Sequence, residues 1–177
     1  MKILTLCGSL RARSVNRALL RAFARLAPAG FVVQPYEPLG RLPHFNPDMD
    51  GEMVAAEVVA LRSAVTGADA LVVSTPEYAH GLPGSFKNAL DWLVSDPTFA
   101  GKPIVILHAS RGSTWALDSL TEVLRTMSAR IVGPACVALP LESNQLDETA
   151  ILARANCYQL LLDSVTELER HLKSQPR

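Results

Sequence analysis

The sequence has few cysteines, no excess of either charge and no apolar run long enough to cross a membrane. Its three cysteines, Cys7, Cys136 and Cys157, are widely spaced and form no CxxC or Cys/His pattern. Such cysteines suit a reducing compartment and predict no metal site. The 17 basic and 17 acidic residues balance, which argues against a nucleic-acid binder with a basic surface and against a strongly acidic electron carrier. The N-terminal apolar run is too short for a signal peptide. We therefore expect a cytoplasmic protein without nucleic-acid or membrane partners.

Two nucleotide-binding motifs are also absent. The chain contains neither GxxxxGK[ST], the loop that holds nucleoside triphosphates, nor GxGxxG, the dinucleotide fingerprint. No Ser–His–acid or paired-carboxylate arrangement is suggested either, which argues against hydrolase chemistry. What remains is a globular composition, 49% hydrophobic and 19% charged. The length fits a single domain over residues 1–177.

The first strand-like segment leads into a polar loop and then a helix. The apolar run Lys2–Cys7 breaks at Gly8, and apolar residues recur at helical spacing from Val15 onward. Residues 8–16 between them carry hydroxyl, amide and guanidinium groups. A helix N-terminus presents unpaired N–H groups and a positive dipole end, which favour a phosphate. The alternative is a helix capped by Ser14 beside two solvated arginines, and the loop alone leaves both interpretations open.

A second segment of the same kind lies at residues 70–93. The continuous apolar run 70–73 is typical of a strand buried on both faces of a parallel sheet. Pro76 ends it, and a turn-rich loop carrying Glu77, Tyr78 and His80 precedes a helix. In open α/β sheets, ligands bind outside the carboxyl ends of the strands, where such loops lie. An ordinary strand-to-helix connection is the alternative.

Further strand and helix patterns alternate along the rest of the chain. Apolar runs predict three more strands, at 31–36, 102–109 and 131–139, and helical spacing predicts helices at 52–66, 117–127 and about 148–172. The order βαβαβαβαβα is that of a doubly wound α/β fold with a five-stranded parallel sheet. The intervening segment 37–51 has three prolines and no periodicity, and loops of that length are often functional.

The two loops together resemble a known family. GSLRARSVNR at residues 8–17 and TPEYAHGLPGSFKNALDW at residues 75–92 are similar to motifs of the NADPH-dependent FMN reductases, which include quinone, chromate and some azo-dye reductases. The resemblance implies a flavodoxin-like three-layer sandwich, with strand order 2-1-3-4-5 and helices on both faces of the sheet. That order places the cofactor crevice between the first and third strands, which are the strands that carry the two motifs.

The resemblance also implies which residues bind the cofactor. The first motif surrounds the FMN phosphate in the family, the second lines the flavin ring, and a third loop after the fourth strand approaches the ring. The positions that match are, in that order, Ser9, Arg11, Ser14, Val15 and Asn16; Pro76, Glu77, Tyr78 and Ala79; and Ser110 and Gly112. Ala79 and Gly81 stand where the family usually has asparagine and serine, so two polar side chains near the ring are missing. Backbone groups can supply much of that binding.

As a member of this family, the chain would take electrons from NADPH or NADH and pass them through FMN to a small molecule. Quinones, azo compounds, free flavins and metal oxyanions are the acceptors that the resemblance implies. The matching residues bind the cofactor, and none is expected to act as a catalytic acid, base or metal ligand. The resemblance further implies a homodimer or homotetramer. Two alternatives remain open: a one-electron carrier of the flavodoxin type, and a flavin-binding or regulatory module without activity.

Overall fold

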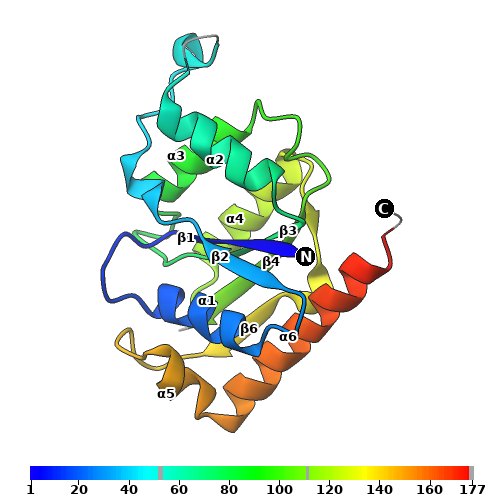
Figure 1. The fold of residues 1–177 in the computed structure, drawn as a ribbon. Coiled ribbons are helices and arrows are strands. Elements are labelled where there is room, and N and C mark those ends of the chain that lie inside the picture. The colour runs from blue at the N-terminus through cyan, green and yellow to red at the C-terminus, as the bar shows by residue number, and fades with distance from the viewer. Residues whose placement is uncertain (52–53, 111, 176–177) are drawn as a thin grey trace.

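The computed structural model describes residues 1–51, 54–110 and 112–175, and its centre is a parallel β-sheet with helices on both sides (Figure 1). The strands are β1 (Lys2–Cys7), β2 (Val32–Pro35), β3 (Ala70–Ser74), β4 (Pro103–Ser110), β5 (Arg130–Ile131) and β6 (Val137–Pro140). The helices are α1 (Val15–Leu26), α2 (Ala56–Thr66), α3 (Gly84–Leu93), α4 (Trp115–Thr126), α5 (Glu148–Leu152) and α6 (Ala155–Lys173). The strand order β2-β1-β3-β4-β5, with β6 also on β4, confirms the expected flavodoxin-like topology.

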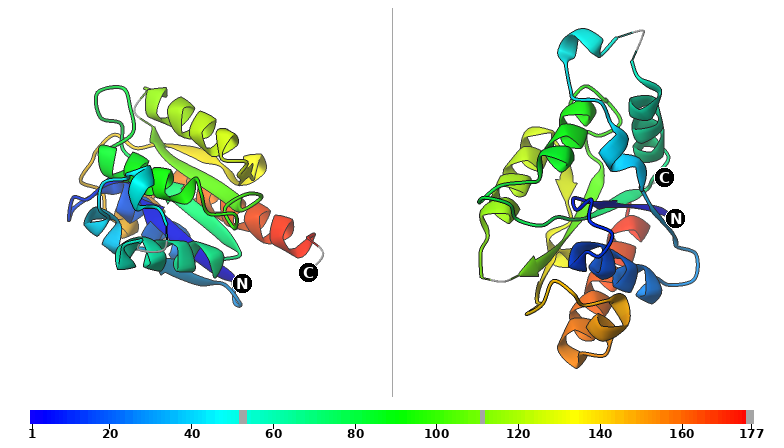
Figure 2. Two further views of the ribbon diagram at one scale, coloured as in Figure 1. Left: turned by 90° about the horizontal axis from the view of Figure 1, so that it is seen from above. Right: turned by 90° about the vertical axis from the view of Figure 1, so that its left-hand side faces the viewer.

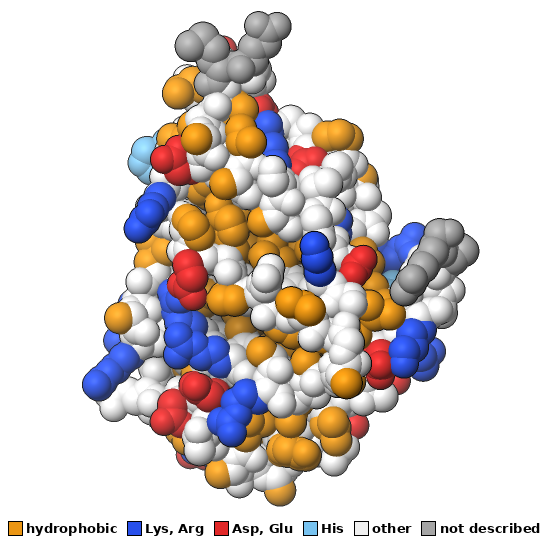
Figure 3. Space-filling model, viewed as in Figure 1, with side chains coloured by type: hydrophobic (Ala, Val, Ile, Leu, Met, Phe, Trp, Pro, Cys, Tyr) orange, Lys and Arg blue, Asp and Glu red, His pale blue; other side chains and the backbone are white. Residues whose placement is uncertain are grey.

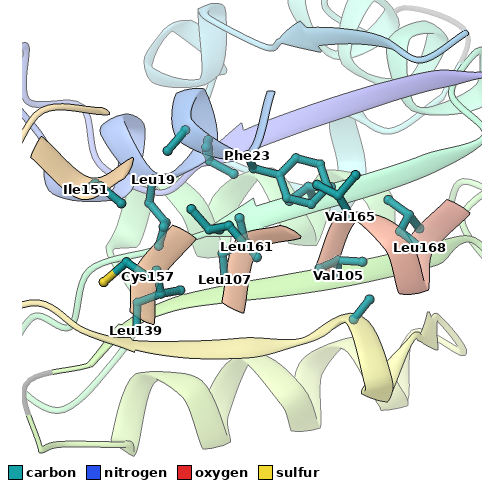
Figure 4. Packing of buried hydrophobic residues seen from close by; sticks show 14 of the residues in the cluster. Leu19, Phe23, Val105, Leu107, Leu139, Ile151, Cys157, Leu161, Val165 and Leu168 are labelled. Carbon is teal, nitrogen blue, oxygen red and sulfur yellow. The ribbon is translucent and has the colours of Figure 1, made fainter. Parts of the chain in front are cut away.

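Two hydrophobic clusters fill the space between the sheet and its helices. Side chains alternate along β4, so Val105 and Leu107 join the cluster under α1 and α6, whereas Ile104 and Ile106 join the one under α2, α3 and α4. Figure 4 shows the first cluster, in which Phe23 of α1 and the α6 side chains lie over the sheet. Every residue of β3 is buried, which explains its continuous apolar run. On the face shown in Figure 3, charges of both signs are interspersed.

The predicted fifth strand, 131–139, is wrong as one continuous element. The chain pairs with β4 through β5, leaves the sheet in a 3₁₀ turn at Gly133–Ala135, and returns as β6. Pro134 lies in that turn, where its missing N–H group breaks no ladder bond. The break between β5 and β6 would leave the Ile106 N–H group without a strand partner. This N–H group instead donates to the Cys136 thiol at 3.3 Å. Cys136 therefore has a polar role that its apolar surroundings did not suggest.

We expect Cys136→Ala to destabilise the fold by about 1–3 kcal/mol, because a partly buried N–H group would lose its acceptor. Burial raises the pKa of the Cys136 thiol, so the thiol stays protonated. Its S–H group donates a hydrogen bond to the Val132 carbonyl at 3.4 Å. Cys136→Ser keeps a donor and acceptor at this position and should lose less stability. Urea denaturation measures both variants. Equal midpoints for the alanine variant and the parent protein would show that the Ile106 N–H group does not depend on the thiol.

Three helices also differ from their predicted bounds. The last one is interrupted after Leu152, so α5 and α6 are separate, and α4 begins at Trp115, two residues earlier than expected. The helix predicted over 52–66 begins at Ala56, and residues 52–53 lie outside the described part of the chain.

The long segment 37–51 packs against α3. Leu39 and Leu42 are buried, and the Trp92 indole N–H group donates to the Pro43 carbonyl at 2.8 Å. Asn88 on the same helix binds Pro43 and Phe45 through its amide nitrogen and oxygen. Trp92 is thus a core residue, and the hydrogen bond of its indole reaches this segment. No residue of 37–51 lines the cavity described below.

Candidate ligand-binding site

A cavity of about 250 Å³ opens at the carboxyl ends of β1, β3 and β4. The right-hand view of Figure 2 looks onto that end of the sheet, where the loops after these strands come together. The residues that line the cavity come from four loops and strand ends: Ser9, Arg11, Ser14, Val15, Asn16, Thr75, Pro76, Glu77, Tyr78, His108, Ala109, Ser113, Leu141 and Asn144. The position is the one expected for a ligand of an open α/β sheet.

The loops after β1 and β3 touch at Gly8. Its N–H group donates to the Ser74 carbonyl at 2.9 Å, which extends the pairing of β1 and β3 by one residue. A Cβ atom on residue 8 would overlap the Thr75 side chain, 2.7 Å from its Cβ atom and closer still to its hydroxyl oxygen. Only glycine leaves room here for the Thr75 side chain. The contact fixes the distance between the two loops that form most of the cavity.

The loop after β1 ends in a capped helix that still offers donors to a ligand. Ser14 has an extended backbone and its hydroxyl accepts from the Arg17 N–H group at 3.5 Å, so the capping interpretation is confirmed. One side-chain cap satisfies only one of the four unpaired N–H groups of a helix N-terminus. The first turn of α1 holds no acidic residue that would repel an anion. Capping and anion binding are therefore compatible here.

Asn16 is the most informative residue of this helix. It is only 4% exposed, and its side-chain oxygen accepts a hydrogen bond from the buried Ser74 hydroxyl at 2.9 Å. With the oxygen occupied, the amide nitrogen keeps two N–H donors on the cavity wall, and the described part of the chain supplies no acceptor for them. Together with Arg11, these donors make the α1 end of the cavity suitable for an anion.

The loop after β3 contains a tight two-residue turn. Tyr78 and Gly81 exchange two backbone hydrogen bonds of 3.0 Å, and the residues between them, Ala79 and His80, have φ angles of 49° and 59°. Positive φ at both central positions defines a type I′ turn, which prefers asparagine and glycine. Because the Tyr78 N–H group is already bonded to Gly81, the turn cannot offer all of its backbone N–H groups to a ligand. The Tyr78 side chain is 49% exposed at the mouth of the cavity.

Glu77 joins this loop to α4. Its carboxylate accepts from the Ser113 hydroxyl at 2.5 Å and from the Ala116 N–H group at 3.0 Å. These two bonds, the hydroxyl first, lower the pKa of Glu77, so the group is ionised at the start of a helix, where the dipole favours a negative charge. Beside it, His108 lies 3.2 Å from the Ser113 carbonyl through Nε2. Ser113 thus connects the ends of β3 and β4.

Eight of the residues predicted to bind the cofactor line the cavity. These are Ser9, Arg11, Ser14, Val15, Asn16, Pro76, Glu77 and Tyr78. Among the described residues, the wall does not include Ala79 or Gly112, and Ser110 is the last residue of β4, directly after the lining residue Ala109. Sequence reasoning missed Thr75, His108, Ser113, Leu141 and Asn144. All five lie at or just beyond the carboxyl end of a predicted strand, which is the signal that was available.

Within residues 1–51, 54–110 and 112–175, no helix is long and apolar enough to cross a membrane. Over the same ranges, no three histidine, cysteine or acidic side chains gather in a way that could hold a metal ion.

Comparisons with known proteins agree with the geometry. The model of the NADPH-dependent FMN reductase family matches residues 1–143. The chain is 37% identical over 115 residues to a quinone reductase of Escherichia coli (strain K12), an alignment that covers 63% of this chain and 61% of the relative. It is 39% identical over 118 residues to a 2-hydroxy-1,4-benzoquinone reductase of Burkholderia sp, covering 64% and 62%. These alignments therefore span less than two thirds of the relatives' length.

Solved structures show the same fold at lower sequence identity. The flavoenzyme NAD(P)H:(acceptor) oxidoreductase FerB from Paracoccus denitrificans superposes with a TM-score of 0.74 at 24% identity, covering 96% of this chain and 98% of that one. An oxidoreductase from Corynebacterium diphtheriae gives a TM-score of 0.68 at 23% identity, covering 99% of both chains.

Proposed function

The chain belongs to the NADPH-dependent FMN reductase family, and on this basis we propose that it binds FMN in the cavity at the carboxyl ends of β1, β3 and β4. The observation that carries the proposal is Asn16, whose buried side chain is oriented by Ser74 and keeps two N–H donors for an anion. The capped N-terminus of α1 and Arg11 add donors for the phosphate at the same end.

The remaining wall fits the ring of the cofactor. Pro76, Ala109 and Leu141 give the cavity apolar surface, and Tyr78 adds an aromatic side chain at its mouth. Bound FMN supplies the redox chemistry, and the protein binds and orients it. Glu77 holds the loop of Tyr78 against α4, so we assign it to positioning rather than to direct contact with the ring. The half-exposed Tyr78 would limit which molecules reach the ring.

We propose that the protein is a reductase which takes electrons from NADPH or NADH and gives two of them to a small-molecule acceptor. Relatives from Escherichia coli and Burkholderia carry the names quinone reductase and 2-hydroxy-1,4-benzoquinone reductase. A quinone is accordingly the acceptor to try first, before azo compounds, free flavins and metal oxyanions. The exposed side chains of Tyr78 and Trp115 beside the site support a homodimer or homotetramer, which light scattering can test.

The test is a visible absorption spectrum of the purified protein after addition of FMN and desalting. We expect retained flavin bands, and then NADPH oxidation that depends on added benzoquinone and on bound FMN. A matched sample that has not received FMN shows how much flavin the protein carries from expression. A protein that retains no flavin would refute the cofactor proposal, whereas a flavin-loaded protein that leaves NADPH and NADH unoxidised would refute the reductase and favour a binding module.

A further inference from the structure

His108 is a lining residue of the described cavity wall whose role the proposed function does not explain. It precedes the end of β4 by two residues and shares the face of Ile104 and Ile106. Its side chain is partly buried and forms part of the cavity wall. The strand fixes its backbone, and the loop after the strand fixes its ring.

The ring orientation follows from its hydrogen bond. Nε2 lies 3.2 Å from the Ser113 carbonyl oxygen, which can only accept, so Nε2 carries a hydrogen. The second nitrogen, Nδ1, then carries an acceptor lone pair in the neutral ring and an N–H donor in the charged ring. No partner for Nδ1 occurs among the residues that the structure describes. Gain or loss of one proton at Nδ1 therefore changes the ring between donor and acceptor without breaking its anchor.

The charged groups around the ring favour that proton once an anion is bound. Glu77 faces His108 from the loop after β3, and His80 lies close enough to Glu77 to interact with it electrostatically. Arg11 and the phenol of Tyr78 are the other charged or titratable groups among the lining residues that the structure describes, and the loop after β6 contributes the uncharged Leu141 and Asn144. Among these described residues Arg11 and ionised Glu77 cancel formally, so a proton on His108 would add net positive charge beside an anionic ligand.

We propose that His108 takes up a proton at Nδ1 when FMN binds, and that the resulting imidazolium is a positioning residue that offsets the ligand's negative charge. The inference rests on the proposed FMN site and adds a pH dependence to it. A phosphate monoester carries a charge of about −1.5 to −2 near pH 7. The proton comes from solvent and returns there when the ligand leaves. The Ser113 carbonyl accepts a hydrogen bond from the His108 ring, and the Ser113 hydroxyl donates one to the Glu77 carboxylate. The charged ring therefore stays beside this carboxylate.

The test measures the dissociation constant of FMN by flavin fluorescence quenching from pH 6 to pH 8. His108→Gln keeps an N–H donor for the Ser113 carbonyl but cannot be protonated, and His44→Gln changes an exposed histidine outside the cavity as the matched control. The FMN phosphate also titrates in this range, so the quantity to compare is the affinity of the parent protein divided by that of each variant. We expect this ratio for His108→Gln to rise roughly three- to tenfold from pH 8 to pH 6, since one unit of pKa shift corresponds to a tenfold change. For His44→Gln it should stay constant.

Calorimetry in two buffers of different ionisation enthalpy gives a second readout. At pH 7 the parent protein should take up a fraction of one proton at His108 for each FMN bound. The His108→Gln variant should lack this contribution. Equal proton uptake, a ratio independent of pH, or a ratio that rises toward pH 8 would overturn the proposal. Thermal melts confirm that the variant is folded, and His108→Asn replaces it if it is not. Failure of the parent protein to bind FMN would refute the cofactor site and this inference together, while flavin binding without NADPH oxidation would refute only the reductase.

Discussion

Gly8→Ala is expected to separate the two loops that form the cavity and to abolish FMN binding. The new Cβ atom would lie 2.7 Å from the Thr75 Cβ atom and 3.2 Å from Cγ of Phe86. Neither loop can retreat without loss, because the Gly8 N–H group donates to the Ser74 carbonyl and Phe86 is fully buried. Overpacking of this kind costs about 1–3 kcal/mol or more, so the melting temperature should fall as well.

The control for this substitution changes a different glycine, one that has open space around it. A Cβ atom at Gly84, the first residue of α3, would meet no heavy atom within 4 Å, so Gly84→Ala should leave stability and FMN affinity near those of the parent protein. Thr75→Gly removes the atoms nearest to the new methyl group and should restore part of the loss in the double variant. If Gly8→Ala melted and bound FMN like the parent protein, the close approach of the two loops would be wrong.

Asn16→Asp is expected to weaken FMN binding by roughly 100- to 1,000-fold and, because the new carboxylate is buried, to lower stability as well. The carboxylate can still accept the buried Ser74 hydroxyl, but it replaces two N–H donors with a negative charge. Two like charges about 4 Å apart repel by about 4 kcal/mol at the effective dielectric constant of a protein surface. Equilibrium dialysis with FMN measures the change directly.

Ser74→Ala separates the two roles of Asn16. It removes the hydroxyl that orients the amide oxygen while leaving the N–H donors in place, so it should reduce FMN affinity less than Asn16→Asp does. The opposite order, with Ser74→Ala the more damaging to affinity, would mean that the amide orientation matters more than its donors. Unchanged affinity in Asn16→Asp would remove the phosphate from this end of the cavity.

The parts of the fold that the sequence predicted are those encoded by local pattern. β1 and β3 are continuous apolar runs because both of their faces are covered, and Gly8 and Pro76 mark where each ends. Two such strands, each followed by a polar loop and a helix, suffice to predict the sheet edge at which the cavity opens. The same reasoning failed at 131–139. Pro134 lies in a 3₁₀ turn and Cys136 at the break between two strands, but in the sequence both look like members of one apolar run.

The connections across the site could not be predicted from local pattern. Glu77 is 36 residues from Ser113 and 39 residues from the Ala116 N–H group that it binds. Periodicity reports which face of a strand or helix is buried, but it does not report which distant loop a polar side chain will meet. The bonds of Glu77 to Ser113 and to α4, and the bond of His108 to the Ser113 carbonyl, were therefore not predicted, although Glu77 does line the cavity.

The two hydrophobic clusters on opposite faces of the sheet have a consequence for the lifetime of the protein in a cell. Val15 and Leu141 belong to the cluster under α1 and α6, and the loop of Tyr78 leads into α3 on the other side; all of them border the cavity. A molecule that fills the cavity touches both halves, and by mass action it stabilises the folded chain increasingly as its free concentration rises above its dissociation constant. A low supply of flavin would then raise the unfolded fraction on which chaperones and proteases act. A cell that lacks flavin would therefore contain less of the protein, in addition to having it without cofactor.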